Sequence, residues 1–188
     1  WKEPWSAVRN EGAALSNPYS LTTITNASQK LDFQFPDTDG NLVSLSDPIF
    51  KNKALIVEIM ASWCSNCKDE TEYLADLYDK YKHSGLEIVA LAYERHSNFK
   101  KAAQCVLKHK NSLGAKYRFL IAGPADKQKA SRDFPMLNGI ISFPTTIFLD
   151  KKGVLRRIYT GFYGPGTGAY YSKFKQETDS LVQKLVSE

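Results

Sequence analysis

The sequence has few cysteines, no long apolar run and no cluster of charge of one sign. Its 188 residues include only three cysteines, too few for a fold that disulfides hold together. No apolar stretch approaches the roughly 18 residues that a membrane-spanning helix needs. The 25 Lys and Arg against 20 Asp and Glu give a net charge of +5 that is spread along the chain. We therefore expect no nucleic-acid ligand.

Length and composition indicate one well-buried core rather than two. The chain is 43% hydrophobic and is long enough for a single domain. Residues 1–29 lack a sustained period and contain Asn-Pro and Ser-rich punctuation, so we interpret them as an N-terminal extension. Residues 30–188 form the predicted domain. Because the chain begins with Trp1, we expect any signal peptide or lipid anchor to lie outside it.

Residues 31–93 carry the clearest secondary-structure pattern. Two runs of alternating apolar residues, LDFQF and LVSL, flank PDTDGN, whose Asp-Gly pair favours a hairpin turn. The run ALIVEIMA at 54–61 is apolar almost throughout, which is typical of a strand covered on both faces. Helical spacing follows, and LEIVALAY at 86–93 predicts a second buried strand. A strand, a helix and a strand in this order predict that the two strands are parallel.

The remaining pattern completes an α/β fold, with a central mixed sheet flanked by helices and a β-hairpin before it. The rest of the chain predicts, in order, a helix over 99–107, a strand over 116–123, a short polar helix over 125–134, a hairpin over 145–161 and a closing helix that contains Phe174, Leu181, Val182 and Leu185. We find no internal repeat and no low-complexity segment.

The stretch EIMASWCSNCKDE places Cys64 and Cys67 between the first buried strand and a helix. A zinc site would need a second pair of ligands, but Cys105 stands alone. The histidines are scattered without ligand spacing, at His83, His96 and His109. A structural disulfide over so short a loop would stabilise the fold little. We therefore interpret the pair as a dithiol whose disulfide bond is made and broken.

The position of the pair predicts different roles for the two thiols. Residues at i and i+3 in a first helical turn lie ~5 to 6 Å apart, which suits a disulfide. Unpaired N–H groups and the helix dipole favour a thiolate at the helix N-terminus. We therefore predict that Cys64 is the nucleophile. Cys67, one turn further in, would attack Cys64 and release the reduced substrate.

With these motifs the sequence resembles the thioredoxin-like proteins, in particular the extracytoplasmic TlpA and ResA type of thiol:disulfide oxidoreductase. The resemblance covers roughly residues 31–187 and includes the hairpin motif, Trp63-Cys64-Ser65-Asn66-Cys67 and FPTTIFLDKKG. It implies a thioredoxin-like fold and an enzyme that reduces protein disulfides outside the cytoplasm. It further implies a membrane-bound electron donor. We expect a monomer that needs no cofactor and no metal.

The resemblance also assigns residues that would bind substrate. Pro144 looks like the cis-proline that lies against the active-site disulfide, and the Phe143 backbone would pair with an extended substrate segment. A trans proline at the start of a strand is the alternative, since only ~5% of X-Pro bonds are cis. Trp63 would be a flat apolar platform beside Cys64, although an aromatic residue at a strand end is ordinarily part of the core or its rim.

Two acidic residues near the cysteines are further candidates for catalysis. Glu58 lies six residues before Cys64, where thioredoxins carry a buried acid that exchanges protons with the second cysteine. Burying a carboxylate is costly, so a proton-transfer role or a buried lysine partner would explain it. Glu70 matches a glutamate that tunes the thiols of ResA-like proteins. Its alternative role is stabilisation of the helix dipole.

Several features limit this interpretation or compete with it. The Ser-Asn dipeptide between the cysteines leaves the direction of electron flow open, and Cys105 is interpreted as incidental. A peroxiredoxin-like peroxidase is disfavoured because Ala61 stands where those enzymes carry Thr or Ser. A module that delivers copper or haem on a thioredoxin scaffold would need Cys-x-x-x-Cys and further ligands. The glycine-rich segment 161–168 lacks a phosphate-loop signature and, by resemblance, borders the active site.

Overall fold

A five-stranded sheet forms the centre of the protein, with the strand order β5-β4-β3-β6-β7. The computed structural model describes residues 8, 10–12, 16–26 and 30–188. The strands of the central sheet are β3 (Ala54–Met60), β4 (Leu86–Glu94), β5 (Arg118–Pro124), β6 (Thr145–Leu149) and β7 (Leu155–Thr160). The helices are α1 (Ser65–Tyr81), α2 (Phe99–Ser112), α3 (Lys127–Asp133) and α4 (Ala169–Ser187). Short 3-10 turns occur at η1 (Pro48–Phe50), η2 (Lys82–Ser84) and η3 (Pro165–Thr167).

The sheet is mixed, as predicted. β3 and β4 are parallel and are joined by α1, which confirms the strand, helix and strand unit. β4 and β5 are also parallel, whereas β6 is antiparallel to both β3 and β7. The pairing register places Glu58 between Ala90 on one side and Thr146 on the other. An acidic side chain therefore lies in the middle of the sheet.

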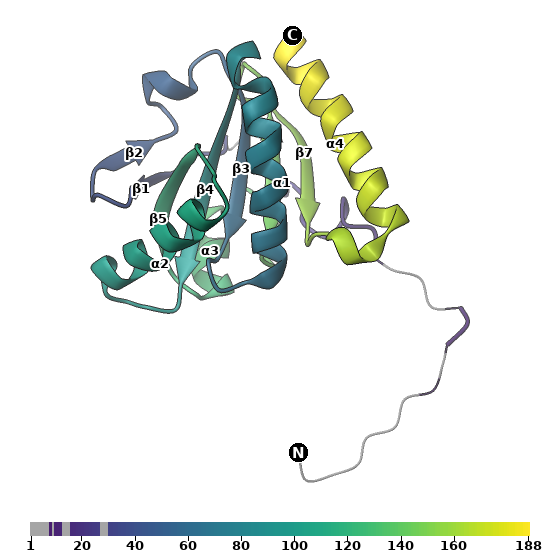
Figure 1. Cartoon of the computed structure of the whole chain (residues 1–188), viewed down its shortest axis with the longest axis horizontal. Helices are drawn as coiled ribbons and strands as arrows, with labels where there is room; N and C mark the ends of the chain where they lie inside the picture. The colour runs from purple at the N-terminus through teal and green to yellow at the C-terminus, as the bar shows by residue number, and fades with distance from the viewer. Residues whose placement is uncertain (1–7, 9, 13–15, 27–29) are drawn as a thin grey trace.

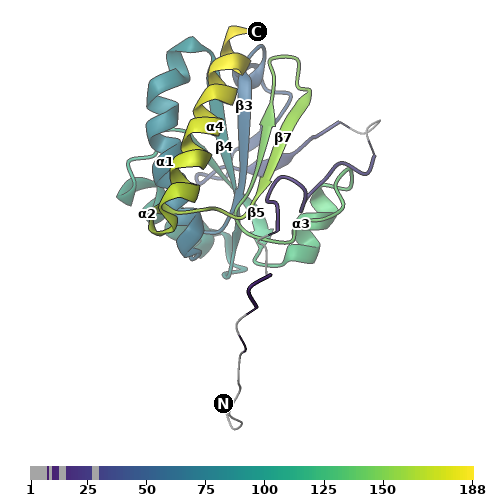
Figure 2. The ribbon, with the colours of Figure 1, turned by 90° about the vertical axis from the view of Figure 1, so that its right-hand side faces the viewer.

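Strand β3 is buried along its whole length because helices or loops cover both faces of the sheet. Ile56 and Met60 pack on one face in a cluster with residues of α1, α2 and α4. Val57 and Ile59 pack on the other face with α3 and the hairpin that precedes β3. Figures 1 and 2 show α1 and α4 on one side of the sheet and α3 on the other. This arrangement explains the continuous apolar pattern at 54–61.

The predicted hairpin before the sheet is also present. It consists of β1 (Gln34–Pro36) and β2 (Leu42–Ser44), which pair antiparallel. The Asp37 carboxylate accepts hydrogen bonds from the backbone N–H groups of Asp39 and Asn41. Gly40 has a φ of 92°, which an L side chain rarely adopts. The turn geometry therefore favours glycine at position 40.

Part of the predicted N-terminal extension contacts the domain, and part lies outside the described residues. The residues that lie outside the described part are 1–7, 9, 13–15 and 27–29. Among the described residues of the extension, Ile24 forms a β-bridge with Leu137, and the Thr160 N–H donates to the Pro18 carbonyl. The boundary at residues 29 and 30 stays a prediction.

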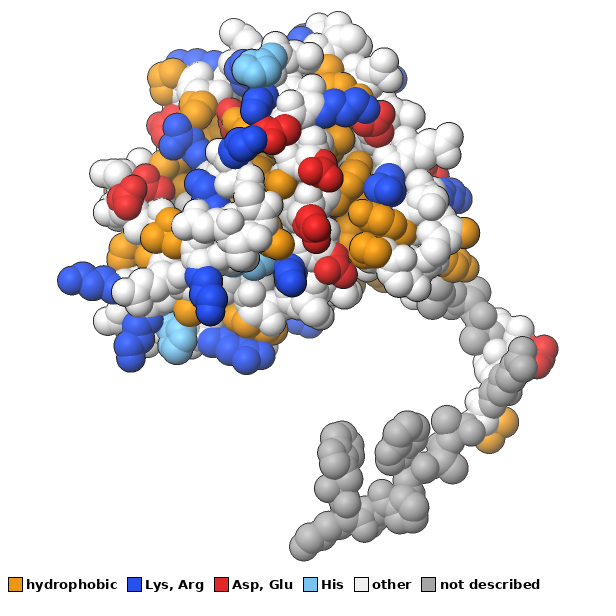
Figure 3. All heavy atoms as spheres, in the orientation of Figure 1, with side chains coloured by type: hydrophobic (Ala, Val, Ile, Leu, Met, Phe, Trp, Pro, Cys, Tyr) orange, Lys and Arg blue, Asp and Glu red, His pale blue; other side chains and the backbone are white. Residues whose placement is uncertain are grey.

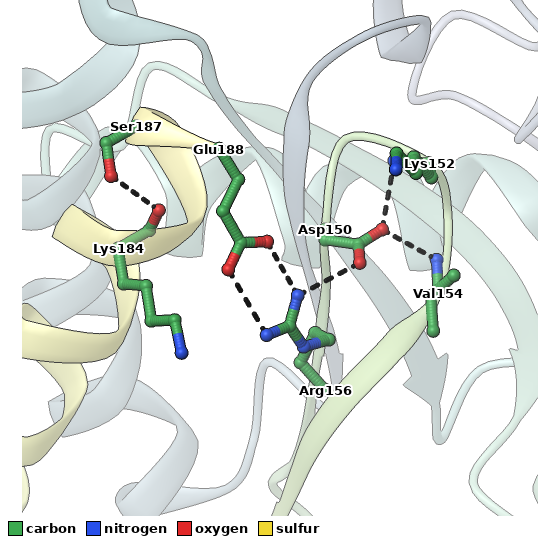
Figure 4. Close-up of polar contacts among 7 residues, drawn as sticks. All are labelled: Asp150, Lys152, Val154, Arg156, Lys184, Ser187 and Glu188. Atoms are coloured by element: carbon green, nitrogen blue, oxygen red, sulfur yellow. Dashed lines mark hydrogen bonds and ion pairs between the residues drawn. The ribbon is translucent and has the colours of Figure 1, made fainter.

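The last turn of α4 is fixed to the β6–β7 hairpin by a small ionic cluster (Figure 4). Arg156 on β7 pairs with Glu188 at 2.6 Å and with Asp150 at 3.1 Å. Asp150 also accepts hydrogen bonds from the backbone N–H groups of Lys152 and Val154. The cluster lies at the opposite end of the sheet from the start of α1 (Figure 1).

The face of the protein drawn in Figure 3 carries charges of both signs. Figure 3 shows Lys and Arg side chains interspersed with Asp and Glu on the face that it draws. Of the helices in the described residues, none is long and apolar enough to cross a membrane.

Candidate active site

Cys64 lies where strand β3 has ended and helix α1 begins. Its backbone is extended, with φ −89° and ψ 123°, and its Sγ accepts a hydrogen bond from the Cys67 N–H at 3.3 Å. Cys64 is therefore the N-cap of α1, in the role that Ser, Thr or Asp usually fills. The Cys64 N–H donates to the Ala61 carbonyl at 3.1 Å, which fixes the turn between strand and helix. Cys64 and Cys67 are both free thiols here.

The two thiols have opposite electrostatic environments. Cys64 is partly exposed, and hydrogen bonds from Cys67 and from the backbone at the helix start lower its pKa to about 6. Cys67 is completely buried. Burial, the hydrogen bond with Cys64 and the nearby Cys64 charge raise the pKa of Cys67. Near neutral pH, Cys64 is therefore a thiolate and Cys67 is a thiol.

This difference predicts the order of alkylation. Iodoacetamide should modify Cys64 of the reduced protein first, with a rate that rises through a midpoint near pH 6, because only the thiolate reacts. Peptide mapping by mass spectrometry at several pH values measures both the site and the midpoint. Labelling of Cys67 at an equal or higher rate would contradict the assignment.

The Phe143–Pro144 peptide bond next to the cysteines is cis, as the resemblance implies. The Phe143 carbonyl oxygen lies 3.5 Å from the Cys64 Sγ. The Phe143 ring stacks on Tyr93 with a centroid distance of 5.6 Å and meets Trp63 edge-on at 6.5 Å. These contacts bring Cys64 and the segment before β6 together, although they lie 79 residues apart in the chain.

Trp63 forms an exposed apolar surface on the rim of the site, beside Cys64 and Phe143. Its side chain is 41% exposed, which is unusual for a residue of its size. The Arg95 guanidinium lies 4.3 Å from the centre of the Trp63 ring. The Ser62 N–H and hydroxyl both donate to Glu94, at 2.7 and 2.8 Å. These contacts fix the loops that carry Trp63 and Arg95 against each other.

Glu58 is fully buried between hydroxyl groups rather than beside a lysine. Thr71 Oγ1 donates to Glu58 Oε1 at 2.9 Å, and the Tyr117 hydroxyl donates to Oε2 at 3.1 Å. Burial raises the pKa of Glu58 to about 8, although both hydrogen bonds oppose the shift. The sequence offered two explanations for a buried Glu58, a proton-transfer role and a buried lysine partner. The described part of the structure has no lysine partner for Glu58. A carboxyl group with this pKa can exchange a proton near neutral pH.

Glu70 lies in the second turn of α1 with its side chain inside the protein. It is fully buried, and Thr146 Oγ1 donates to its Oε1 at 2.8 Å. Its Oε2 has no hydrogen-bond partner among the described residues. Burial and the charge of Glu58 raise the pKa of Glu70 well above its ordinary value. Glu70 lies beyond the first turn of α1 and faces the interior, a position that disfavours the alternative role of stabilising the helix dipole.

The sequence did not identify the polar side chains that surround these acids. Thr71, Tyr117 and Thr146 each donate a hydrogen bond to Glu58 or Glu70. His109, which the sequence interpretation left among scattered histidines, lies against Thr71 at 3.1 Å. Its spacing from Ala102 and Val106 places it on the buried stripe of α2, a signal that could have been used.

Comparison with known proteins identifies the family of the chain. Residues 25–169 match the Redoxin family. The chain belongs to the Redoxin family. Within this family, similarity to ResA proteins supports the TlpA and ResA type that the sequence resembles. It is 28% identical over 142 residues to the "Thiol-disulfide oxidoreductase ResA" of Geobacillus thermodenitrificans, covering 74% of this chain and 72% of that protein. It is 27% identical over 139 residues to the Bacillus subtilis protein of the same name, covering 74% and 69%.

Solved structures show that the Redoxin chain has the thioredoxin-like fold. A thiol:disulfide interchange protein of the thioredoxin family from Chlorobium tepidum superposes with a TM-score of 0.62 at 20% identity, covering 87% of this chain and 97% of that one. A secreted thiol-disulfide isomerase from Corynebacterium glutamicum superposes with a TM-score of 0.66 at 18% identity, covering 93% and 97%. The predicted fold class is therefore confirmed.

Proposed function

We propose that this protein is a thiol-disulfide oxidoreductase that reduces disulfides in other proteins through Cys64 and Cys67. The observation that carries the proposal is the pairing of a partly exposed thiol of pKa about 6 with a buried thiol one helical turn away. The first thiol is ready to attack, and the second is protected until it is needed. Its likeness to proteins named thiol-disulfide oxidoreductase supports the same reaction.

The reaction proceeds in two exchanges. The Cys64 thiolate attacks one sulfur of the substrate disulfide, so that a mixed disulfide forms and the other substrate sulfur leaves as a thiolate. Cys67 then loses its proton and attacks Cys64, which releases the second substrate thiolate and forms the Cys64–Cys67 disulfide. The substrate gains two electrons and the protein dithiol loses them. Glu58 accepts the Cys67 proton, and Glu70 is a second buried acid that interacts electrostatically with Glu58 and Cys64.

Substrate would bind across the rim beside Cys64. The backbone of Phe143, at the start of the segment that leads into β6, is placed to pair with an extended peptide. Trp63 supplies apolar contact for residues that flank the substrate cysteine, and Pro144 shapes the surface below them. Arg95, held over Trp63, adds a positive charge to this surface.

We further propose that a membrane-bound donor reduces the disulfide again and that the protein is a monomer outside the cytoplasm. Each turnover consumes the Cys64–Cys67 dithiol, so an external source of two electrons is required. The support for the donor and the location is the likeness to ResA proteins.

Two other functions fit the site less well. A peroxidase of the peroxiredoxin type needs a hydroxyl group three residues before its cysteine, whereas Ala61 is fully buried there and has none. In the part of the chain that the structure describes, no group of three or more His, Cys, Asp or Glu side chains could hold a metal ion. A metal-delivery role therefore has no ligand set in this part of the protein.

One preparation can test these functions together. We expect the protein to accelerate insulin reduction by dithiothreitol, to consume no hydrogen peroxide and to bind no copper stoichiometrically. Cys105→Ser is the matched control, since Cys105 is half-buried on α2 and is not part of the dithiol, and it should keep full activity. Absence of insulin reduction, or peroxide consumption at a comparable rate, would overturn the proposal.

A further inference from the structure

A chain of polar contacts leads from the buried Glu58 toward the surface of the protein. Glu58 Oε1 lies 2.9 Å from Thr71 Oγ1, and Thr71 Oγ1 lies 3.1 Å from His109 Nε2. The three residues come from β3, α1 and α2, so the chain crosses from the sheet through both helices. Glu58 and Thr71 are 0% exposed, whereas His109 is 8% exposed. His109 is thus the first member of the chain that reaches solvent.

The other neighbours of Glu58 lead inward. Tyr117, which donates to Oε2, is itself 1% exposed and stacks on Phe119 at 4.9 Å. Glu70 is fully buried and shares its hydrogen bond with the equally buried Thr146. In the described part of the protein, neither of these side chains offers a route to water. A proton taken up by Glu58 leaves most directly through Thr71.

The hydrogen-bond directions suit transfer from Glu58 to His109. The Ser62 backbone makes a further hydrogen bond with the His109 ring. In the neutral imidazole that carries its proton on Nδ1, Nε2 is free to accept from the Thr71 hydroxyl. When Glu58 is protonated, its O–H can donate to Thr71 Oγ1, which replaces the hydrogen bond that Thr71 donates to the carboxylate. If the Glu58 proton moves to Thr71 while the Thr71 proton moves to His109, the products are a Glu58 carboxylate, an intact Thr71 hydroxyl and a His109 imidazolium.

The charges around His109 favour quick release of that proton. Burial and the nearby Lys68 ammonium lower the pKa of His109, although the bond with the Ser62 backbone opposes them. An imidazolium at this position therefore loses its proton readily to water. The titratable groups that face the chain from the elements packed against it are Lys68 and Glu70 of α1, Tyr117 before β5, and the two cysteines.

We propose that Thr71 and His109 form a proton path that connects Glu58 with the protein surface while Cys67 attacks the mixed disulfide. The inference rests on the proposed function, because it describes where the Cys67 proton goes after Glu58 has accepted it. Thr71 and His109 touch neither the substrate nor the reacting sulfur atoms. They act through Glu58 by returning it to the carboxylate form that the next turnover needs.

The test separates the two exchanges by stopped-flow kinetics between pH 5 and 9, using a disulfide-linked fluorescent peptide as substrate. His109→Gln keeps an N–H group near Thr71 but cannot carry a proton in this range. It should slow the Cys67 step about tenfold and remove one ionisation from its pH profile. The Cys64 step should stay within about twofold of the wild-type rate. His83→Gln, which changes an exposed histidine of η2, is the matched control and should change neither step.

A pair of Thr71 variants makes the test independent of folding defects at His109. Thr71→Val removes the hydroxyl and should slow the Cys67 step as His109→Gln does, whereas Thr71→Ser keeps the hydroxyl and should react like the wild type. Wild-type rates and pH profiles in both His109→Gln and Thr71→Val would overturn the proton path and leave the oxidoreductase proposal intact. A wild-type protein that forms no mixed disulfide would instead overturn the proposed function.

Discussion

Replacing Cys67 with serine should stop the reaction at the mixed disulfide and leave the substrate covalently attached to Cys64. The attack of Cys64 needs only its own thiolate, which the start of α1 stabilises. Release of the substrate needs a second sulfur nucleophile, and Cys67 is placed one turn behind for this step. Turnover in the insulin assay should fall by ~10³-fold or more, as expected when a nucleophile is removed.

Non-reducing gels and intact-protein mass spectrometry measure the trapped species directly. Cys64→Ser should be equally inactive but should trap nothing at the active site, because the remaining thiol of the pair, Cys67, is buried and its pKa is raised. Cys105→Ser provides the control for general effects of removing a thiol. A substrate adduct on Cys67 in the Cys64→Ser variant would show that the roles of the two cysteines are reversed.

Replacing Glu58 with glutamine should slow the Cys67 step by ~10 to 100-fold and leave the Cys64 step near its normal rate. Glutamine has nearly the same volume, so Tyr117 can still donate to its oxygen while its NH₂ group donates to Thr71. The variant loses only the ability to accept a proton. Stopped-flow kinetics from pH 5 to 9 resolve the two steps. An unchanged Cys67 step over this range would exclude Glu58 as the base and favour Glu70.

The same substitution should make the protein more stable toward alkaline pH. Burial raises the pKa of Glu58 from its ordinary 4.5 to about 8. Within that window the folded protein holds a proton that the unfolded chain has lost, so the wild-type free energy of unfolding falls as pH rises. Glu58→Gln removes this loss, and its advantage should grow to more than about 1 kcal/mol by pH 8.

Urea denaturation at pH 5 and at pH 8 measures this difference. Near pH 5 the advantage of the variant should be smaller than at pH 8, because the unfolded chain, with a pKa of 4.5 for this side chain, has not lost all of the proton that the folded protein holds. Glu70 has a raised pKa of the same origin and contributes to the pH dependence of both proteins. A wild-type protein that is more stable than the variant at pH 8 would show that Glu58 is ionised and well solvated.

Local pattern was enough to predict the elements that carry the site. The alternation in β1 and β2, the apolar run of β3 and the helical spacing after Cys64 each depend on near neighbours in the chain. Placement of Cys64 at a helix start follows from the same pattern. The burial of Glu58 was predictable as well, because every neighbour in LIVEIM is apolar.

The partners of the buried acids could not be predicted in the same way. Thr71 and Tyr117 meet Glu58 from 13 and 59 residues away, and Thr146 meets Glu70 from 76 residues away. Such contacts depend on how α1 crosses the sheet and on the pairing register of β3 with β6. The burial of Glu70 could have been predicted from local pattern, since Glu70 lies four residues before the buried Leu74 and thus on the inward stripe of α1.

The N-cap role of Cys64 also makes the redox equilibrium depend on the start of α1. The cap stabilises a thiolate, which exists only in the reduced protein, so oxidation forfeits that stabilisation. Lowering the pKa of Cys64 from 9.0 to about 6 therefore moves the reduction potential toward more oxidising values. At pH 7 the move is at most about 30 mV, and screening of the partly exposed sulfur by solvent makes it smaller. A donor of only modest reducing strength can consequently reduce the Cys64–Cys67 disulfide back to the dithiol.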